Sequence, residues 1–406
     1  MKGLIAIGLT ALGGIGVLAW SPDQPDLSNG ESVGFRMVGE PVPVGLMPTT
    51  PLLTDLDADG DIDVIVVCGP CCGREVCEDS GHVQVLLNDG DGRLTKRDER
   101  IRLGGTALGG ATGDVNGDGH VDVVVHHHSS YDAAVLLGDG AGGLRLHGYT
   151  PLHDGESAHV HSIALADVNG DGHLDMLATL VDDHALAVLL GDGEGGFVPA
   201  LGQPYFAQQH PYAQLNTVDI NGDGAIDAVL TDMRGNGMTV LAGSGTGMFA
   251  PLLGFNLNTS MPLSSAERPM ACALGDVDGD GDLDAVTFID ESPIAVLMIN
   301  EGGGVYAEAP DALIDLGAPC VGGTLADVTG DGVLDVVASG TVVTTVSIVP
   351  GKRGGGFGKP RLIEAGGLSP HVAVADMNGD GRLDLVTGNY DGGTIGVLTA
   401  TRSAND

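Results

Sequence analysis

The sequence predicts an all-β fold, a seven-bladed β-propeller whose blades are small four-stranded antiparallel sheets. Two observations predict it. A nine-residue acidic motif recurs seven times along the 406 residues, and each copy lies within the same series of short apolar runs and glycine-rich turns. Units of four short strands that repeat about every fifty residues bury their apolar faces only against one another. They are therefore expected to pack side by side around a ring.

The acidic motif has the pattern D-x-[DNT]-x-D-G-x-x-D, and successive copies start 59, 53, 52, 57, 51 and 49 residues apart. The copies are DLDADGDID from Asp55, DVNGDGHVD from Asp114, DVNGDGHLD from Asp167, DINGDGAID from Asp219, DVDGDGDLD from Asp276, DVTGDGVLD from Asp327 and DMNGDGRLD from Asp376. The array occupies almost all of the chain after residue 30. Residues 33–406 are therefore predicted to form one repeat domain, preceded by a linker over residues 21–32.

Each unit repeats the same order of elements, as residues 159–200 illustrate. The apolar run 163–166 enters the acidic motif, and the run 174–180 leaves it. A third run covers 185–190, and the glycine turn GDGEGG leads into a fourth run from Phe197. Short apolar runs without a helical period, bounded by turn residues, predict four β-strands in an antiparallel sheet.

The two ends of the chain predict how the ring closes. The seventh unit has its acidic motif at 376–384 and a third strand near 394–398, but no segment remains for a fourth strand. The segment VGFRMVGEPVPV, residues 33–44, resembles the fourth-strand segments of other units at 142–152 and 195–205. We therefore expect the N-terminal segment to complete the last blade.

The first twenty residues differ in kind from the rest. After one early lysine, residues 3–20 carry no charge, and a polar stretch with two prolines follows. This pattern is typical of an export signal, with Val17 and Ala19 as the small residues before a cut. The alternative is an uncut membrane anchor, since eighteen helical residues span roughly 27 Å. Both alternatives place the repeat domain outside the cytoplasm, in the periplasm or at the cell surface.

Charge and composition exclude some classes of function. The chain has 55 acidic and 17 basic residues, a formal net charge of −38. Nucleic acid is excluded as a partner because phosphate binding needs a basic footprint. Aromatic residues make up 3% of the chain, which disfavours a lectin based on stacking platforms. No nucleophile elbow, phosphate-binding loop or separate carboxylate pair is present, so catalysis is not the expected function, although the sequence leaves it open.

The acidic motifs are predicted to bind up to seven calcium ions. Side-chain oxygens at positions one, three and five converge, position seven offers its backbone carbonyl, and the aspartate at position nine closes the shell. The sixth copy is the weakest, because Thr329 stands at position three. The alternative is a plain Asx-rich turn. The predicted ligands, from position one to nine of each copy, are Asp55, Asp57, Asp59, Asp61 and Asp63; Asp114, Asn116, Asp118, His120 and Asp122; Asp167, Asn169, Asp171, His173 and Asp175; Asp219, Asn221, Asp223, Ala225 and Asp227; Asp276, Asp278, Asp280, Asp282 and Asp284; Asp327, Thr329, Asp331, Val333 and Asp335; and Asp376, Asn378, Asp380, Arg382 and Asp384.

The units resemble FG-GAP/VCBS repeats, which occur in integrin α-subunit propellers and in many secreted bacterial and fungal proteins. The segments ALADVNGDGHLDMLA and AVLLGDGEGGF carry this resemblance, and it covers about 370 residues. The resemblance implies a propeller fold with calcium in its loops. It leaves the function open, since this fold serves adhesion modules, lectins, lyases and structural subunits.

Most histidines are predicted on the face opposite the acidic motifs. Strand-two-to-three loops are expected to hold His82, His126, His127, His128 and His184, and blade crossings His153, His159, His161, His210 and His371. His159 and His161 are two apart on one strand and should point the same way. With His210 they form a candidate zinc or copper site or a pH-sensitive contact site. The alternative is a set of ordinary solvated loop residues.

The first unit contains a cysteine-rich segment. CGPCCGREVC places Cys68, Cys71, Cys72 and Cys77 in one loop. In an exported protein these residues favour local disulfides, and a zinc or copper thiolate site is the alternative.

Together these observations favour a calcium-stabilised extracytoplasmic binding or assembly module with a protein partner, such as an accessory subunit of a membrane-associated complex. The competing hypothesis is a carbohydrate-binding or lyase-type propeller.

Overall fold

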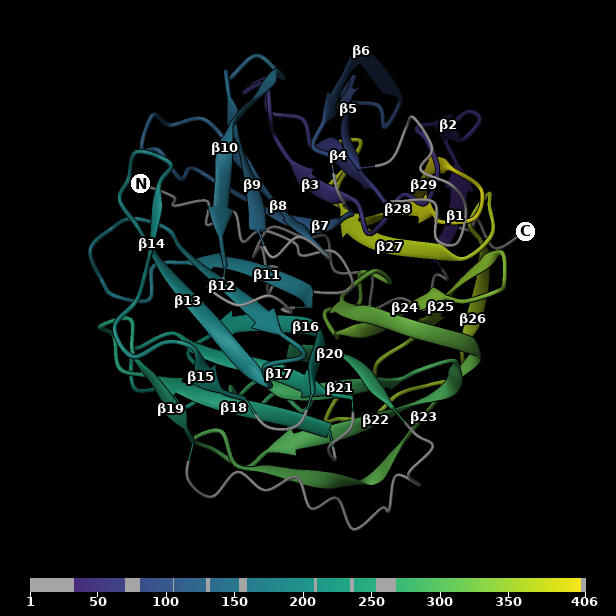
Figure 1. The fold of residues 1–406 in the computed structure, drawn as a ribbon. Helices are drawn as coiled ribbons and strands as arrows, with labels where there is room; N and C mark the ends of the chain where they lie inside the picture. Colours follow the sequence, from purple (N-terminus) through teal and green to yellow (C-terminus); the bar gives the residue numbers. More distant parts are fainter. Residues whose placement is uncertain are drawn as a thin grey trace.

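The computed structural model describes residues 33–69, 81–104, 106–128, 132–152, 159–207, 210–233, 237–252 and 268–402. All 29 elements in this part of the chain are β-strands, and Figure 1 shows their sheets arranged side by side around a common centre. Within the same residues, no helix has the length and apolar character needed to cross a membrane. The predicted export signal or anchor, residues 1–20, lies outside the described residues.

The third unit has the four strands that the sequence predicts. They are β11 (Val160–Ala166), β12 (Asp175–Leu180), β13 (Ala185–Gly191) and β14 (Phe197–Pro199), and they pair antiparallel in this order. A short strand, β15 (Tyr205–Phe206), pairs with the first two residues of β13. The prediction of small antiparallel four-stranded sheets is confirmed.

Three further units repeat this order. They are β3 (Leu52–Thr54), β4 (Asp63–Cys68), β5 (His82–Asn88) and β6 (Leu94–Arg102); β7 (Ala107–Gly113), β8 (Asp122–His127), β9 (Asp132–Gly138) and β10 (Leu144–Pro151); and β16 (Pro211–Val218), β17 (Asp227–Asp232), β18 (Gly237–Gly243) and β19 (Phe249–Pro251).

The fifth and sixth units share one long strand, which the sequence analysis did not foresee. Their sheet has seven strands: β20 (Pro269–Gly275), β21 (Asp284–Ile289), β22 (Ser292–Asn300), β23 (Tyr306–Ala326), β24 (Asp335–Gly340), β25 (Thr345–Val349) and β26 (Arg361–Glu364). β23 pairs with β22 along its first part and with β24 along its last part. Buried and exposed residues alternate over 312–320, so the crossing between these units, where Cys320 lies, is itself extended strand.

The ends of the chain meet in one sheet. It contains β27 (Pro370–Ala375), β28 (Asp384–Asn389), β29 (Thr394–Arg402) and, beyond β29, the N-terminal strand β1 (Val33–Met37). β1 pairs with β29 over five residues, and β2 (Val42–Pro43) pairs with the start of β29 (Figure 1). β1 therefore lies beside β29 at the edge of this sheet.

The apolar core lies between neighbouring sheets. One cluster joins Val124 and Val135 of the second unit to Ile163 and Met176 of the third. The second strand of every unit, six residues long, is buried throughout, because sheets cover both of its faces. This explains why these strands lack the alternation of buried and exposed residues of a half-buried strand, and why even their polar members, such as Thr179, Asp232 and Asn389, are buried.

Candidate metal centres and the histidine-rich face

The acidic motifs form seven loops of the same geometry, each between the first and second strand of a unit. In every loop the aspartate at position one accepts a hydrogen bond from the N–H of the glycine at position six, at 2.8–3.1 Å. That glycine has a positive φ in all seven loops, for example 88° at Gly172. Side chains other than glycine rarely adopt this conformation, which accounts for glycine at position six.

Inside a loop, the side chains fold back onto the backbone. In the third loop, Asp167 also accepts a bond from the N–H of Gly170 at 2.7 Å, and Asn169 Oδ1 accepts from the N–H of Asp171 at 2.9 Å. Asp171 in turn accepts from the N–H of His173 at 2.9 Å. The bonds that Asn169 and Asp171 accept from the residues two positions further on are Asx turns. They also hold the oxygens of positions one, three and five in place.

The aspartate at position nine has a role that the sequence analysis missed. In all seven loops it is fully buried, it is the first residue of the second strand, and both of its carboxylate oxygens accept backbone N–H groups. Asp175 accepts from Val168 at 2.9 Å and from Gly191, the last residue of β13, at 2.8 Å. The carboxylate therefore ties the loop to the end of the third strand. The sequence did contain a signal for this role, because an aspartate recurs at the start of each buried second strand.

Burial raises the pKa of every position-nine carboxyl, although the two N–H donors oppose this effect. The pKa rises to about 6 in Asp63 and Asp384 and to about 7 in Asp335. It rises also in Asp122, Asp175, Asp227 and Asp284. The cause is desolvation, which disfavours the charged form of a buried carboxyl.

Two loops bring three carboxylates together. Ligand oxygens of Asp55, Asp57 and Asp63 lie within 4.8 Å of one another in the first loop, and those of positions one, three and nine converge likewise in the fifth. Asp55 Oδ1 and Asp57 Oδ1 are buried and accept no hydrogen bond. Such oxygens suit a hard cation such as calcium, so the residues present fit the predicted ion. The seventh-position carbonyl ligands stay a prediction.

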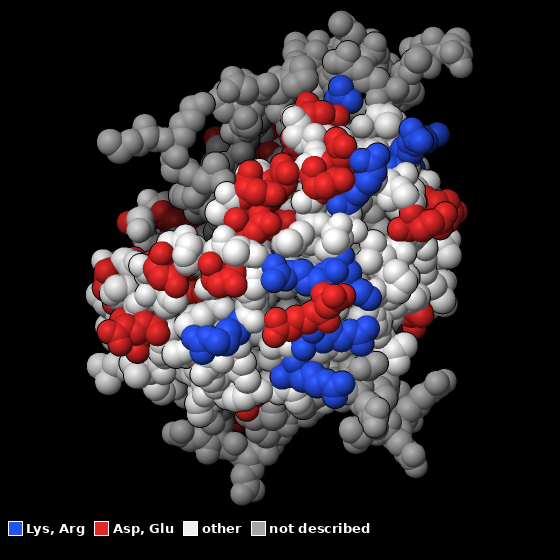
Figure 2. Space-filling model, turned by 90° about the horizontal axis from the view of Figure 1, so that it is seen from above, with Lys and Arg blue, Asp and Glu red and all other residues white. Residues whose placement is uncertain are grey.

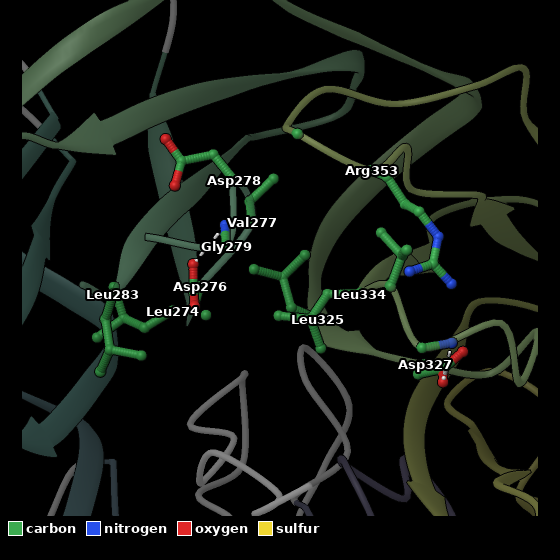
Figure 3. A pocket seen from close by; sticks show the side chains of 14 residues that line it. Leu274, Asp276, Val277, Asp278, Gly279, Leu283, Leu325, Asp327, Leu334 and Arg353 are labelled. Carbon is green, nitrogen blue, oxygen red and sulfur yellow. Dashed lines mark hydrogen bonds between the residues drawn. The ribbon is translucent and has the colours of Figure 1, made fainter. Parts of the chain in front are cut away.

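The sixth loop differs from the others and borders a cavity. A cavity of about 480 Å³ separates it from the fifth loop, with Asp276 and Asp278 on one side and Asp327 and Arg353 on the other (Figure 3). Arg353 donates from Nη2 to the backbone carbonyl of Asp331 at 2.8 Å. Position three offers one neutral oxygen here, the buried hydroxyl of Thr329.

Three histidines from two neighbouring units meet at the end of the sheets opposite the acidic loops. His128 follows β8, His159 precedes β11, and His161 lies in β11. Their ring centroids are 4.0 Å (128–159), 4.8 Å (128–161) and 4.5 Å (159–161) apart. His210, placed with His159 and His161 by the sequence analysis, packs instead beside His184, with centroids 5.4 Å apart. It is near enough to influence the pKa values of His159 and His161.

Several other histidines belong to strands rather than to the predicted loops. His82 begins β5, and His126 and His127 end β8, all three buried. His127 Nδ1 is 2.6 Å from Asp132 Oδ1. Buried His371 lies in β27 with its ring 5.7 Å from that of Tyr390. His153 lies outside the described residues.

The cysteine predictions are only partly within the described chain. Cys68 is buried at the end of β4, and Cys71, Cys72 and Cys77 lie outside the described residues, so the local disulfides stay a prediction. Cys272 and Cys320 are buried thiols, and burial raises the pKa of each to about 12. Neither is suited to react as a thiolate at neutral pH.

Comparison with solved structures shows the propeller-like fold. Similar structures include a lectin of Agrocybe aegerita that recognises non-reducing terminal N-acetylglucosamine (19% identity, TM-score 0.52, covering 86% of this chain and 87% of that one). BBS1N in complex with ARL6DN has 9% identity and a TM-score of 0.59 (91% and 98% covered). The periplasmic gluconolactonase PpgL of Pseudomonas aeruginosa has 17% identity and a TM-score of 0.55 (82% and 96%). These identities support a shared fold and carry no function to this chain.

Comparison with family models is more specific. No curated protein sequence matches the chain. The model described as FG-GAP-like repeat matches residues 55–125, 114–178, 167–230 and 219–287, and the model described as FG-GAP repeat matches residues 370–401. These matches span more than half of the sequence, begin or end around the acidic loops, and agree with the four-stranded units of the structure. The chain therefore belongs to the FG-GAP repeat family.

Proposed function

We propose that this protein is a calcium-stabilised, seven-bladed propeller, closed by β1 on the last blade, that works outside the cytoplasm as a protein-binding or assembly module. The observation that carries the calcium part is the loop geometry. Seven loops repeat one hydrogen-bonded arrangement, and in the first loop two buried carboxylate oxygens have no donor. Several carboxylates within about 4 Å repel by a few kcal/mol per pair at intermediate dielectric, and a bound dication removes this cost.

The calcium ions would stabilise the fold rather than take part in a reaction. Each would hold the loop between the first and second strands, beside the position-nine carboxylate that already ties the loop to the third strand. Binding to the folded state alone stabilises that state by mass action. Metal analysis of protein prepared without chelator should find about seven calcium ions per chain, and chelation should lower the melting temperature. Two or fewer ions per chain would contradict this role.

A basic strip on β6 supports a protein partner. Arg93, just before β6, is paired with Asp89 and Asp91. β6 itself holds Lys96, Arg97, Arg100 and Arg102 against two acidic residues, a local charge of +2. Three of these four basic side chains are exposed, and Figure 2 shows Lys and Arg side chains gathered on this side of the molecule among acidic ones. On a chain of net charge −38, a compact positive region favours a partner with an acidic surface.

The partner hypothesis is tested by charge reversal on the full chain. Lys96→Glu/Arg100→Glu should reduce recovery of specific partners from membrane fractions, measured by quantitative affinity purification. Lys352→Glu/Lys359→Glu makes the same change at exposed positions far from β6 in the sequence and should not. If both variants recover the partners equally well, the basic strip on β6 does not bind them.

Carbohydrate binding is the second candidate. The similar lectin recognises a terminal sugar, but the identity of 19% supports only the fold for this chain. Among the described residues, the exposed aromatic side chains Tyr149 and Phe206 belong to different units, so neither forms a stacking platform with the other. Screening the calcium-loaded protein against immobilised glycans distinguishes the two candidates.

A further inference from the structure

We propose that His128, His159 and His161 form a transition-metal site of the zinc or copper class, separate from the acidic loops and independent of the calcium role. The three side chains come from two neighbouring units. Nε2 of His159 lies 3.1 Å from Nε2 of His161 and in close contact with Nε2 of His128. One nitrogen from each of the three rings lies within 4.8 Å of the other two.

The spacing agrees with the demands of a small metal ion. Zinc binds histidine nitrogen at about 2.0–2.1 Å, so two ligands of a tetrahedral site lie roughly 3.3 Å apart. The separation between His159 and His161 is close to this value, and His128 needs only a small side-chain rotation away from His159. Without a metal, these Nε2 atoms pair as hydrogen-bond donor and acceptor, with roles set by the tautomer of each ring.

The backbone beneath the site is held in place. The pairing of β11 with β12 shifts register between Val160 and Ile163, the stretch that contains His161. Such a bulge re-aims a side chain. The N–H of Ser162 donates to Thr179 Oγ1 at 3.0 Å instead of to a strand carbonyl, and the carbonyl of His159 accepts from the N–H of Val181 at 2.8 Å. His159, just before β11, and His161, within it, therefore start from a fixed backbone position.

The environment favours the metal-binding form of the rings. His161 is buried, and His128 and His159 are half-buried. Burial and the neighbouring histidines lower the pKa of His161 to about 2 and that of His128 to about 4, so both are neutral at pH 7. A metal then displaces no proton from them. Burial also lowers the pKa of His159, and the exposed carboxylate of Asp182 opposes the lowering in His128 and His159 without reversing it.

Three imidazoles leave the fourth position of a tetrahedral ion open to water or to a ligand. The half-buried rings of His128 and His159 place that position toward the surface. Calcium is a poor occupant, because it takes oxygen ligands. The two kinds of site should therefore fill with different metals and be measurable separately.

The test is titration of the full, calcium-loaded protein with zinc, followed by calorimetry, and with cobalt, followed by visible absorption. We expect one ion per chain at micromolar zinc or tighter, and cobalt absorption typical of a tetrahedral nitrogen site without a thiolate charge-transfer band. A thiolate band would assign the ion to the cysteine-rich segment and overturn the proposal. Binding that needs millimolar zinc would overturn it as well.

Variants decide which histidines are ligands. His159→Ala is the main one, because this half-buried residue can be truncated with little loss of packing, and His128→Asn is the second. Each should weaken zinc binding by more than about a hundredfold, beyond the tenfold to hundredfold that loss of an outer-shell partner causes. His147→Ala, on the exposed part of β10, and His210→Ala should bind as the wild type does. Undiminished binding by His159→Ala, or equal loss in His210→Ala, would refute the assignment.

Discussion

Removal of the position-nine carboxylate tests the structural account of the loops. Asp175 accepts the N–H groups of Val168 and Gly191 at 2.9 and 2.8 Å and is fully buried. Asp175→Ala leaves the buried N–H of Val168 and the part-buried N–H of Gly191 without an acceptor. A buried unsatisfied donor costs about 1–3 kcal/mol, and a part-buried one costs less because water can reach it. We therefore expect the unfolding free energy to fall by about 2–4 kcal/mol, with or without calcium.

Asp171→Ala, in the same loop, is the matched control. Its carboxylate is exposed and accepts bonds from His173 N–H and Asn169 Nδ2. Water can replace it, so in chelator the cost should be below about 1 kcal/mol. In calcium the cost should grow, because a metal ligand is lost as well.

Urea unfolding of both variants and the wild type is measured in chelator and in calcium. It gives the loss of unfolding free energy relative to the wild type for each variant under each condition. The expected pattern is a large effect of Asp175→Ala under both conditions and an effect of Asp171→Ala that depends on calcium. If the two variants lose the same stability in chelator, the position-nine carboxylate does not tie the loop to the third strand. If calcium changes neither difference, the loops do not bind it.

Three further predictions follow from single features of the structure. Asp331→Ala should lower the melting temperature in calcium less than Asp171→Ala, since the sixth loop already carries Thr329 at position three; a larger effect would contradict the ranking. Deletion of residues 31–45 removes the strands that pair with β29 and should lower the melting temperature measured by circular dichroism, and an unchanged melt would contradict the closure. Burial lowers the pKa of His371 to about 4, so the unfolded chain takes up its proton first, from about pH 6.5 downward. His371 alone should therefore lower the unfolding free energy by about 2 kcal/mol between pH 7 and pH 5, at about 1.4 kcal/mol per pH unit. His371→Asn should lose this part of the pH dependence, and His147→Asn should keep it.

The sequence by itself determined the local features. The acidic loop, its glycine at position six and the four strands of the third unit were all predictable, because each depends on residues within a few positions of one another. The acidic loop occurs in seven copies, so each copy gave independent support for these predictions. The pairing partner of residues 33–44 was also predictable, because one unit lacked a strand and one segment resembled the missing piece.

The tertiary structure alone decided which distant residues meet. His128 rather than His210 joins His159 and His161, because the packing of β8 against β11 and the bulge at His161 set the positions of the rings. The continuous strand β23 follows from burial of one face of the crossing at 312–320, where the sequence suggested a loop. The second hydrogen bond of each position-nine aspartate comes from a residue sixteen positions further along in six units, for instance Gly191 for Asp175, and twenty-five positions further along in the first unit, where Asn88 donates to Asp63. Contacts of this kind depend on how sheets and strands stack in space, and that information is absent from any short stretch of the chain.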